Sequence, residues 1–242
     1  MPESITKYAS LSQFADDTGL WTSAYTFHGC LTKLQKAVNE LESWCRKWRM
    51  KLNGSKSNLM ISTKLHDAVP DDISIQIFND IVRPVTSAKF LGITYDDSMS
   101  MKEHVDNTIR KAMSRLGVFK LLSFGGVKNE TLIKLYKVYV RPLFEYGSVS
   151  LIHIPGEIER AQKVQNVFIR TSLRLPSYLS IELLHTAANL EMMHDRLLSL
   201  NNKLLGKMMR SEIVQELHST YETIIPFNRF KSPFDVLTIP SA

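Results

Sequence analysis

Two adjacent carboxylates, Asp16 and Asp17, are the residues of this sequence best suited to chemistry by type and spacing. They follow Phe14-Ala15 and stand between two short segments that favour β-strands, so a tight turn would hold them at the tip of a hairpin. Like charges at close range repel, and a bound divalent cation with hard oxygen ligands removes that cost. Two such ions can activate an attacking hydroxyl and stabilise a departing pyrophosphate. The string therefore predicts a metal-dependent site, with an ordinary aspartate turn as the alternative.

Positive charge is concentrated in one segment of the chain. The 242 residues carry a formal net charge of +6, but residues 101–174 hold 13 Lys and Arg against 6 Asp and Glu, so this segment carries +7 and the rest −1. Such a segment indicates a polyanionic partner, and the alternative is a solvated helical face. No apolar run is long enough to cross a bilayer, so we expect no membrane partner.

Cysteine usage favours an intracellular protein, in the nucleus or the cytoplasm. Cys30 and Cys45 fall on one expected helix, where helical rise would separate them by about 22 Å, too far for a disulfide. No set of Cys and His residues has the spacing of zinc ligands.

The elements that must position the carboxylates form a mixed first part of the chain. Two β segments over 7–24 flank the Asp-Asp turn, and apolar residues at helical spacing predict an amphipathic helix over 30–48 whose two tryptophans, Trp44 and Trp48, belong to the core. Strands are then expected over 59–62, at the alternating isoleucines of 73–77, at 81–82 after an Asn79-Asp80 turn, and over 90–93.

Helices are expected from residue 100 onward. Ser100-Met101-Lys102-Glu103 fits a capping box in which Glu103 reaches back to the Ser100 amide. After Gly125-Gly126, a second helix begins near Asn129 with Leu132, Leu135, Tyr139 and Leu143 as its apolar stripe, and Pro142 should kink or end it. Further helices are expected from Pro155, over 180–190 and over 193–209, followed by a loose end. These patterns predict an α+β fold.

The sequence resembles the reverse transcriptases of non-LTR (LINE-type, jockey-like) retrotransposons over about residues 8–200. The ordered blocks that carry the resemblance are Phe14-Ala15-Asp16-Asp17-Thr18, the tryptophan-bearing helix, Leu52-Asn53-Gly54-Ser55-Lys56, Phe90-Leu91-Gly92-Ile93, and Tyr139-Val140-Arg141-Pro142-Leu143-Phe144-Glu145-Tyr146-Gly147. The family implies a partial palm over 1–97, an antiparallel sheet with a packed helix and the primer-grip region, then a helical thumb or connection over 98–220 and a loose tail over 221–242.

The resemblance also implies roles for individual residues. Asp16 and Asp17 would be catalytic ligands of Mg²⁺ or Mn²⁺. Asn53 and Lys56 would lie near the phosphates of the incoming dNTP, where a lysine neutralises charge as pyrophosphate leaves. Leu91 and Gly92 would support the primer-grip hairpin. His104 and His185 are expected to be structural.

Nucleic acid is the partner that the family implies: an RNA template with a DNA primer, or an RNA–DNA hybrid. Contacts to its backbone would come from basic residues and would be independent of base sequence and sensitive to salt. The expected contact residues are Lys102, Arg110, Lys111, Arg115, Lys120, Lys134, Lys137 and Arg141.

The family's two-metal site needs a further carboxylate on an earlier strand. Only fifteen residues precede Asp16 here, and the acid among them is Glu3. We therefore expect this polypeptide to be a fragment of an RNA-directed DNA polymerase that is inactive by itself. The alternatives are a non-catalytic nucleic-acid-binding remnant that uses the basic helices and a structural protein with decayed ancestry.

Overall fold

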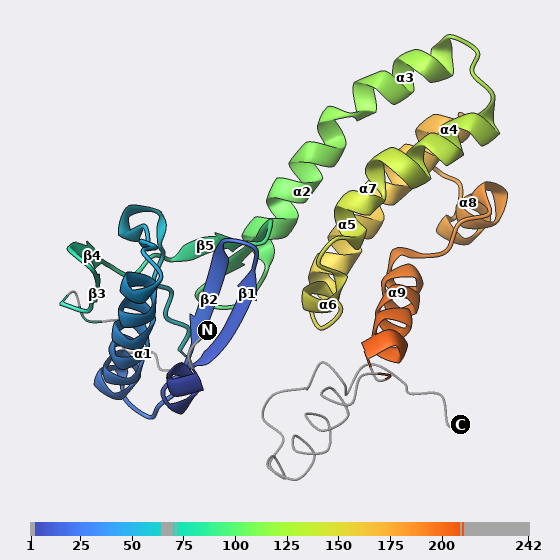
Figure 1. Cartoon of the computed structure of the whole chain (residues 1–242). Helices are drawn as coiled ribbons and strands as arrows, with labels where there is room; N and C mark the ends of the chain where they lie inside the picture. The colour runs from blue at the N-terminus through green and yellow to red at the C-terminus, as the bar shows by residue number, and fades with distance from the viewer. Residues whose placement is uncertain (1–2, 64–69, 71, 209, 211–242) are drawn as a thin grey trace. The chain divides into compact units, whose positions relative to one another are not determined.

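The structure, a computed structural model, describes residues 3–63, 70, 72–208 and 210. The chain divides into two compact units, Met1–Ser100 and Met101–Ala242 (Figure 1). The first combines helices with antiparallel strand pairs and the second is helical, so the α+β prediction is confirmed in this coarse form. The tail expected over 221–242 lies outside the described residues.

In the described residues, the first unit combines one long helix with hairpins. In chain order its elements are η1 (Glu3–Lys7), β1 (Ser10–Phe14), β2 (Asp17–Trp21), α1 (Phe27–Lys47), η2 (Gly54–Lys56), β3 (Ile75–Ile77), β4 (Asp80–Val82), β5 (Ser87–Phe90) and β6 (Ile93–Asp96). The pairs β1–β2, β3–β4 and β5–β6 are antiparallel and each is two-stranded in the described part of the chain. The antiparallel sheet expected for a partial palm is thus present there as separate hairpins.

Three strand predictions need correction. Residues 59–62 form no strand, because Leu59 makes only an isolated bridge with Pro84. The segment 90–93 is a hairpin turn rather than one strand, because β5 ends at Phe90 and β6 begins at Ile93. Leu91 and Gly92 form the two-residue turn between them, with φ of 47° and 83°. Positive φ at both positions is typical of such hairpin turns. The turn before β4 likewise begins one residue early, at Phe78, whose φ is 51°.

Helix α1 is the amphipathic helix that the sequence predicted, but it begins earlier. The Thr26 hydroxyl accepts a hydrogen bond from the Gly29 N–H at 3.1 Å and so caps the helix before residue 30. Its inward face contributes Val38 to one apolar cluster with β3 and β4, and Leu41 to a second cluster with η1. The prediction for Trp48 was wrong: it stands beyond the last helical residue and is 62% exposed.

The Asn53-Gly54-Ser55-Lys56 block forms the short turn η2, which lies directly against β4. Gly54 is buried, and a Cβ atom added to it would lie 2.4 Å from Cβ of Asp80. Carbon atoms do not approach this closely, so only glycine permits the contact. The absence of a side chain at Gly54 therefore lets the turn that carries Asn53 and Lys56 pack against β4.

We expect Gly54→Ala to lower the free energy of unfolding of the first unit by about 1–3 kcal/mol, because the added methyl group must displace β4. Urea unfolding followed by tryptophan fluorescence measures this unit alone, since all three tryptophans lie within Met1–Ser100. Ser43→Ala is the control in the same unit, because Ser43 is exposed on α1 and its substitution should leave the unfolding midpoint nearly unchanged. Equal midpoints for Gly54→Ala and the unsubstituted chain would contradict the close approach.

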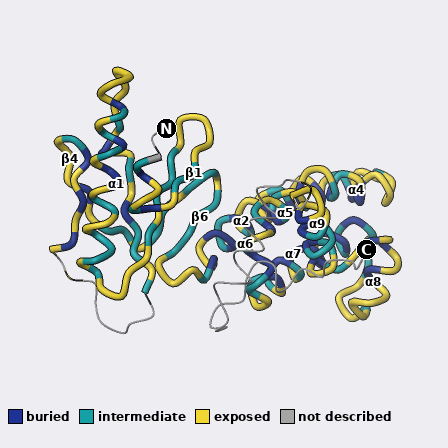
Figure 2. The backbone as a smooth tube through the Cα atoms, turned by 60° about the horizontal axis from the view of Figure 1, so that its bottom comes forward, coloured by how far each residue is buried: buried dark blue, intermediate teal, exposed yellow. Residues whose placement is uncertain are grey.

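The second unit is built around one central helix. Its elements are α2 (Lys102–Ser114), α3 (Leu116–Phe124), α4 (Asn129–Leu135), η3 (Tyr136–Val140, a π-helical turn), α5 (Pro142–Glu145), α6 (Ser148–Leu151), α7 (Pro155–Leu173), α8 (Ile181–Ala188) and α9 (Met193–Met208). Figure 2 shows buried positions recurring along α7. Phe168 on α7 is fully buried, with its ring edge-on to Phe119 at 4.9 Å between centroids.

The expected capping box before α2 is wrong. The Asp96 carboxylate accepts from the Ser100 N–H at 2.7 Å and from the Ser100 hydroxyl at 3.1 Å. The helix instead begins after Met101, which adopts a left-handed conformation with φ of 59°. The Ser100 amide was expected to donate to Glu103, and it donates to Asp96 instead.

Pro142 changes the buried stripe of the following helix. Proline has no N–H to donate, so the α-helical hydrogen-bond pattern is interrupted at Pro142. Just before it, the Arg141 N–H donates to the Tyr136 carbonyl, five residues back, at 3.0 Å. The residues buried along this segment are Leu132, Tyr136, Val140 and Phe144, each four positions after the last. The expected stripe was wrong at Tyr139, which is 47% exposed.

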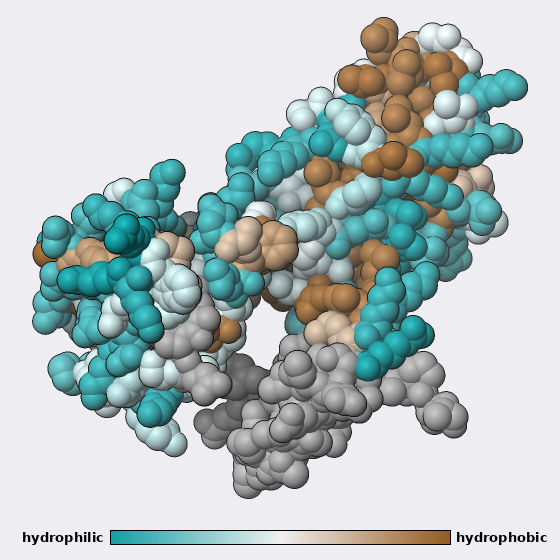
Figure 3. All heavy atoms as spheres, in the orientation of Figure 1, coloured by the Kyte–Doolittle hydropathy of each residue, from teal (hydrophilic) through white to brown (hydrophobic). Residues whose placement is uncertain are grey.

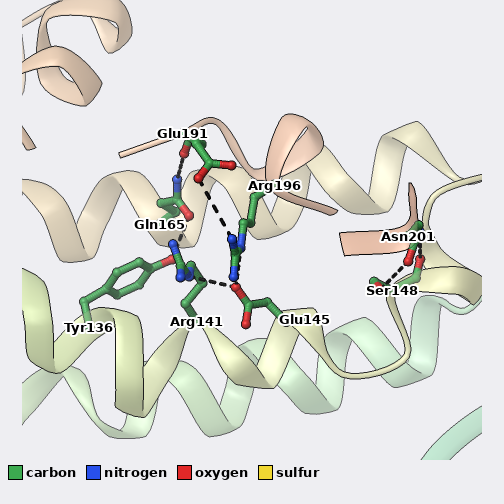
Figure 4. A network of polar contacts seen from close by, with 8 residues as sticks. All are labelled: Tyr136, Arg141, Glu145, Ser148, Gln165, Glu191, Arg196 and Asn201. Carbon is green, nitrogen blue, oxygen red and sulfur yellow. Dashed lines mark hydrogen bonds and ion pairs between the residues drawn. The ribbon is translucent and has the colours of Figure 1, made fainter. Parts of the chain in front are cut away.

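A polar network connects this kinked helix to α7 and α9 (Figure 4). The Glu145 carboxylate contacts Arg141 at 2.8 Å and Arg196 at 2.7 Å. The Tyr136 hydroxyl donates to Gln165 at 2.8 Å, and the Gln165 amide donates to the Glu191 carbonyl at 2.7 Å. Burial raises the pKa of Tyr136, so its hydroxyl stays protonated and able to donate.

Candidate functional site

The carboxylates predicted to be catalytic lie at the tip of the β1–β2 hairpin. The register pairs Phe14 with Asp17, which leaves Ala15 and Asp16 as the two-residue turn. Ala15 has a φ of 53°, and the Gln13 side-chain amide donates to its carbonyl at 3.1 Å. Both carboxylates are exposed, and neither forms an ion pair within the described residues. The hairpin that the sequence predicted is therefore present.

The Leu91-Gly92 turn is held against this hairpin by an aromatic contact. A Cβ on Gly19 would lie 3.2 Å from Cζ of Phe90, so the Phe90 ring rests on the β2 backbone. Gly19 stands two residues beyond Asp17, which is about 7 Å along a strand. The Asp-Asp block and the Phe90–Ile93 block, which are far apart in the chain, are therefore neighbours in the fold. The sequence contains no signal that predicts this contact.

Asn53 and Lys56 lie on η2 and are both exposed. The Asn53 side-chain oxygen accepts from the Ser55 hydroxyl at 2.7 Å, and its main-chain oxygen accepts from the Lys56 N–H at 3.2 Å. These bonds fix the turn. In the described residues no hydrogen bond or ion pair joins this turn to Asp16 or Asp17, so their common role stays a prediction.

The carboxylate pair fits a weakly held, largely hydrated cation. Mg²⁺ keeps several water ligands and often takes only one or two carboxylates from a protein. Asp16 lies in the turn and Asp17 is the first residue of β2, and both carboxylates are exposed at the hairpin tip. The described residues contain no group of three His, Cys, Asp or Glu side chains that could hold a metal ion. Any Mg²⁺ or Mn²⁺ here would depend on water or on other ligands.

The basic residues of the second unit divide into two groups. The exposed group comprises Lys102, Arg110, Lys111, Lys120 and Lys134, with Lys137 half-buried. They do not form one stripe, because adjacent helical positions such as Arg110 and Lys111 point about 100° apart. They therefore offer a dispersed positive surface rather than a groove.

Arg115 and Arg141 are engaged inside the unit. The Arg115 guanidinium donates to the Tyr139 carbonyl and lies over the Tyr139 ring, 4.0 Å from its centroid. The Arg141 side chain is only 13% exposed and is paired with Glu145. Both side chains are thus held within the second unit, Arg115 at Tyr139 and Arg141 largely buried beside Glu145. Their expected contacts with nucleic acid stay a prediction.

The two histidines expected to be structural are buried. The His185 ring lies between the Leu190 carbonyl, 3.0 Å from Nδ1, and the Asn166 side-chain oxygen, 2.9 Å from Nε2. This bridge from α8 to α7 confirms the structural role of His185. Burial, with a smaller contribution from Lys111, lowers the pKa of His104.

An exposed apolar patch on α3 was missed by the sequence analysis. Val118, Leu121 and Phe124 are 50%, 73% and 90% exposed, and Figure 3 shows hydrophobic side chains gathered where α3 and α4 lie. The signal was present in the sequence, because α3 has more apolar residues than one buried face can hold. Among the described helices, none is both long enough and apolar enough to span a bilayer.

Comparison with curated proteins finds similarity to polymerases of mobile elements. The chain is 28% identical over 193 residues to "Probable RNA-directed DNA polymerase from transposon BS" of Drosophila melanogaster, which covers 78% of this chain and 21% of that protein. It is 23% identical over 222 residues to the corresponding protein from transposon X-element of the same organism, with 86% and 24% covered. Against the "RNA-directed DNA polymerase from mobile element jockey" it is 20% identical over 203 residues, with 82% and 22% covered.

The chain spans between a fifth and a quarter of the length of these relatives. No family model matches the chain, and no solved structure matches it. The similarity confirms the resemblance to LINE-type reverse transcriptases that the ordered motifs indicated.

Proposed function

We propose that this chain is the part of a LINE-type RNA-directed DNA polymerase that carries its Asp-Asp turn, its primer-grip hairpin and its thumb. The observation that supports this most directly is the packing of Phe90 on Gly19, because it brings the Leu91-Gly92 turn beside the carboxylate hairpin. A catalytic carboxylate and a backbone turn that supports a primer end must be neighbours for nucleotidyl transfer.

In this proposal the residues of the chain bind and position the reactants. Asp16 and Asp17 would hold Mg²⁺ or Mn²⁺, which when bound lowers the cost of hydroxyl attack and of pyrophosphate departure. Lys56, on the η2 turn that Gly54 holds in place, would neutralise charge on the dNTP phosphates. The Leu91-Gly92 turn would contact the primer strand.

The second unit would contact the backbone of an RNA–DNA hybrid through exposed cations. Lys111, Lys120 and Lys134 are exposed and lie on α2, α3 and α4. Each cation that neutralises a phosphate releases a counterion, so affinity would fall steeply with salt.

The metal role is tested with Mn²⁺ and the variant Asp16→Asn/Asp17→Asn. We expect Mn²⁺ to broaden the NMR signals of the β1–β2 turn in the unsubstituted chain and not in the variant, because both carboxylates are lost. Asp97→Asn, which removes an exposed carboxylate elsewhere in the first unit, should leave the broadening unchanged.

We also expect no primer extension on poly(rA)/oligo(dT) by this 242-residue polypeptide, since the described residues supply too few ligands for the metal ions.

Broadening that persists in the double variant would contradict the metal assignment. Primer extension by the unsubstituted chain that Asp16→Ala abolishes would instead contradict the expected inactivity and show a complete site.

The nucleic-acid role is tested by titrating salt against an RNA–DNA hybrid, with binding measured by fluorescence anisotropy. We expect Lys111→Gln/Lys120→Gln/Lys134→Gln to reduce the slope of log K against log salt by about 2.7, or roughly 0.9 for each lost phosphate contact. The matched control is Lys163→Gln/Lys203→Gln/Lys207→Gln, which removes the same charge from exposed positions on α7 and α9.

If the two triple variants had equal slopes of log K against log salt, the hybrid would be bound through the net charge of the chain and not through a surface formed by Lys111, Lys120 and Lys134. The chain could show the predicted salt slopes with the hybrid while Mn²⁺ fails to broaden the signals of the β1–β2 turn. That result would favour the alternative of a non-catalytic nucleic-acid-binding protein.

A further inference from the structure

The end of α1 and the residues that follow it form a basic surface on the first unit. Four of the six residues 46–51 are Lys or Arg, and residues 43–56 contain five such cations and no Asp or Glu. All six residues of 46–51 are exposed. Two of them are large and apolar: Trp48 is 62% exposed and Met50 is 46% exposed. Exposed cations are therefore interleaved with exposed apolar side chains.

Most cations of this surface are not neutralised by an acid of the unit. The Arg46 guanidinium is 3.6 Å from the Glu42 carboxylate. Within the described residues, Lys47, Arg49 and Lys51 form no ion pair. Cations in the last turn of a helix interact favourably with its free carbonyl groups. That structural role accounts for Lys47, but not for the two cations that follow the helix.

Arg49 has a backbone conformation that glycine adopts at lower cost. Its φ is 55°. Its N–H donates to the Arg46 carbonyl at 3.2 Å, and the Met50 N–H donates to the Cys45 carbonyl at 2.8 Å. This pair of hydrogen bonds ends many helices, usually with glycine at the position of Arg49. Other residues in the left-handed region are disfavoured and gather at functional sites, so the arginine here indicates a use for its side chain.

Trp48 is held in place by its neighbour on the helix. The Trp48 N–H donates to the Trp44 carbonyl at 3.1 Å, and the centroids of the two rings are 6.3 Å apart. Trp44 is half-buried and packs against the apolar cluster that contains Leu41. The Trp48 ring is therefore positioned before any partner arrives, which lowers the entropy that binding would cost.

We infer that this surface binds a single-stranded nucleic acid, with phosphates at Lys47, Arg49 and Lys51 and a base stacked on Trp48. Proteins bind single strands through cations that follow the backbone and aromatic rings on which bases stack. A duplex would engage the cations alone, because its bases are already stacked on one another. The polymerase proposal uses none of these residues and places an RNA–DNA hybrid on the second unit, so the inference does not rest on it.

An anionic membrane would attract the same cations, but it fits the apolar residues less well. Binding at a membrane surface grows with the apolar area that enters the lipid. Only Trp48 and Met50 could supply such area within 46–51, and Arg49 separates them. The aromatic ring beside three cations therefore favours a single strand.

The test follows the tryptophan emission of the full chain in EDTA while a twelve-nucleotide oligo(rU) is added. All three tryptophans lie in the first unit, so binding to the second unit is not observed directly. We expect saturable quenching that Trp48→Phe abolishes, because a base stacked on an indole ring quenches its emission. Trp21→Phe is the matched control and should keep the quenching, since it removes a tryptophan that is 54% exposed on β2.

Arg49→Gly separates binding from stability. We expect the Kd measured by quenching to rise about fivefold at about 0.1 M salt, because one lost contact with a single-strand phosphate changes the salt exponent by roughly 0.7. The urea midpoint of the first unit should rise, because glycine adopts the left-handed backbone without strain. Lys36→Gln removes the same charge from an exposed position in the middle of α1 and should change Kd less than about twofold.

The absence of quenching by oligo(rU), or quenching that persists in Trp48→Phe, would overturn the proposal. Equal quenching by a twelve-base-pair duplex would overturn it too, and so would displacement of oligo(rU) by poly(Glu) at equal charge, because either would show attraction without stacking. A blue shift of the emission on vesicles of phosphatidylserine and phosphatidylcholine, without quenching by oligo(rU), would indicate a membrane surface instead. Because this readout needs neither metal nor hybrid, its failure is distinguishable from failure of the Asp16 and Asp17 assignment.

Discussion

Glu145→Ala should lower the free energy of unfolding of the second unit by about 3 kcal/mol, because removal of one partner leaves a largely buried charge without compensation. Glu145 contacts both Arg141 and Arg196, whose side chains are 13% and 21% exposed. Two guanidinium groups therefore lose the same carboxylate in one substitution. The measurement is urea unfolding followed by circular dichroism at 222 nm, where the helical unit dominates.

Two controls separate this network from general effects of losing an acid. Glu159→Ala removes an exposed glutamate from α7 and should change stability by less than about 0.5 kcal/mol. Glu145→Gln keeps a hydrogen-bond acceptor without the charge and should fall between the two. Tryptophan fluorescence, which reports the first unit, should not change. If Glu145→Ala and Glu159→Ala unfold at the same urea concentration, the network does not stabilise the unit.

Phe168→Ala should cost the second unit about 3–5 kcal/mol, the range for truncating a fully buried aromatic side chain. The Phe168 ring is buried completely, lies edge-on to Phe119 and is 5.7 Å from the Tyr136 ring. Its loss opens a cavity at the centre of the core that surrounds α7. The same urea experiment measures the effect.

Phe124→Ala is the matched control, because it makes the same chemical change at a position on α3 that is 90% exposed. We expect less than about 0.5 kcal/mol there. A cost for Phe168→Ala no larger than that for Phe124→Ala would show that the core is not organised around this ring.

The Tyr139–Gly147 block, which carries part of the resemblance, has a structural role in the second unit. Arg141 and Glu145 form an internal ion pair, Phe144 is in the core, and Gly147 has a φ of 75° that favours glycine. Pro142 begins α5 and forces the π turn before it. These residues therefore stabilise the second unit from within.

The sequence by itself determined the elements whose signals are local. The hairpin around the Asp-Asp pair, most of helix α1 and helix α7 follow from turn residues and apolar spacing, which act within a few positions. The break at Gly125-Gly126 is local in the same way. These predictions agree with the structure because the forces that set them do not reach beyond neighbouring turns of the chain.

Only the tertiary structure decided what the candidate site is made of. The contact of Phe90 with Gly19 and that of Gly54 with Asp80 join residues far apart in the chain, and periodicity carries no information about such pairs. Tyr136 is buried and Tyr139 is exposed, because Tyr136 packs against Phe168 of α7, a contact that helical spacing alone does not reveal. Arg141 was expected to contact nucleic acid, and the folded unit pairs its largely buried guanidinium with Glu145, because a buried charge is stable only beside its opposite.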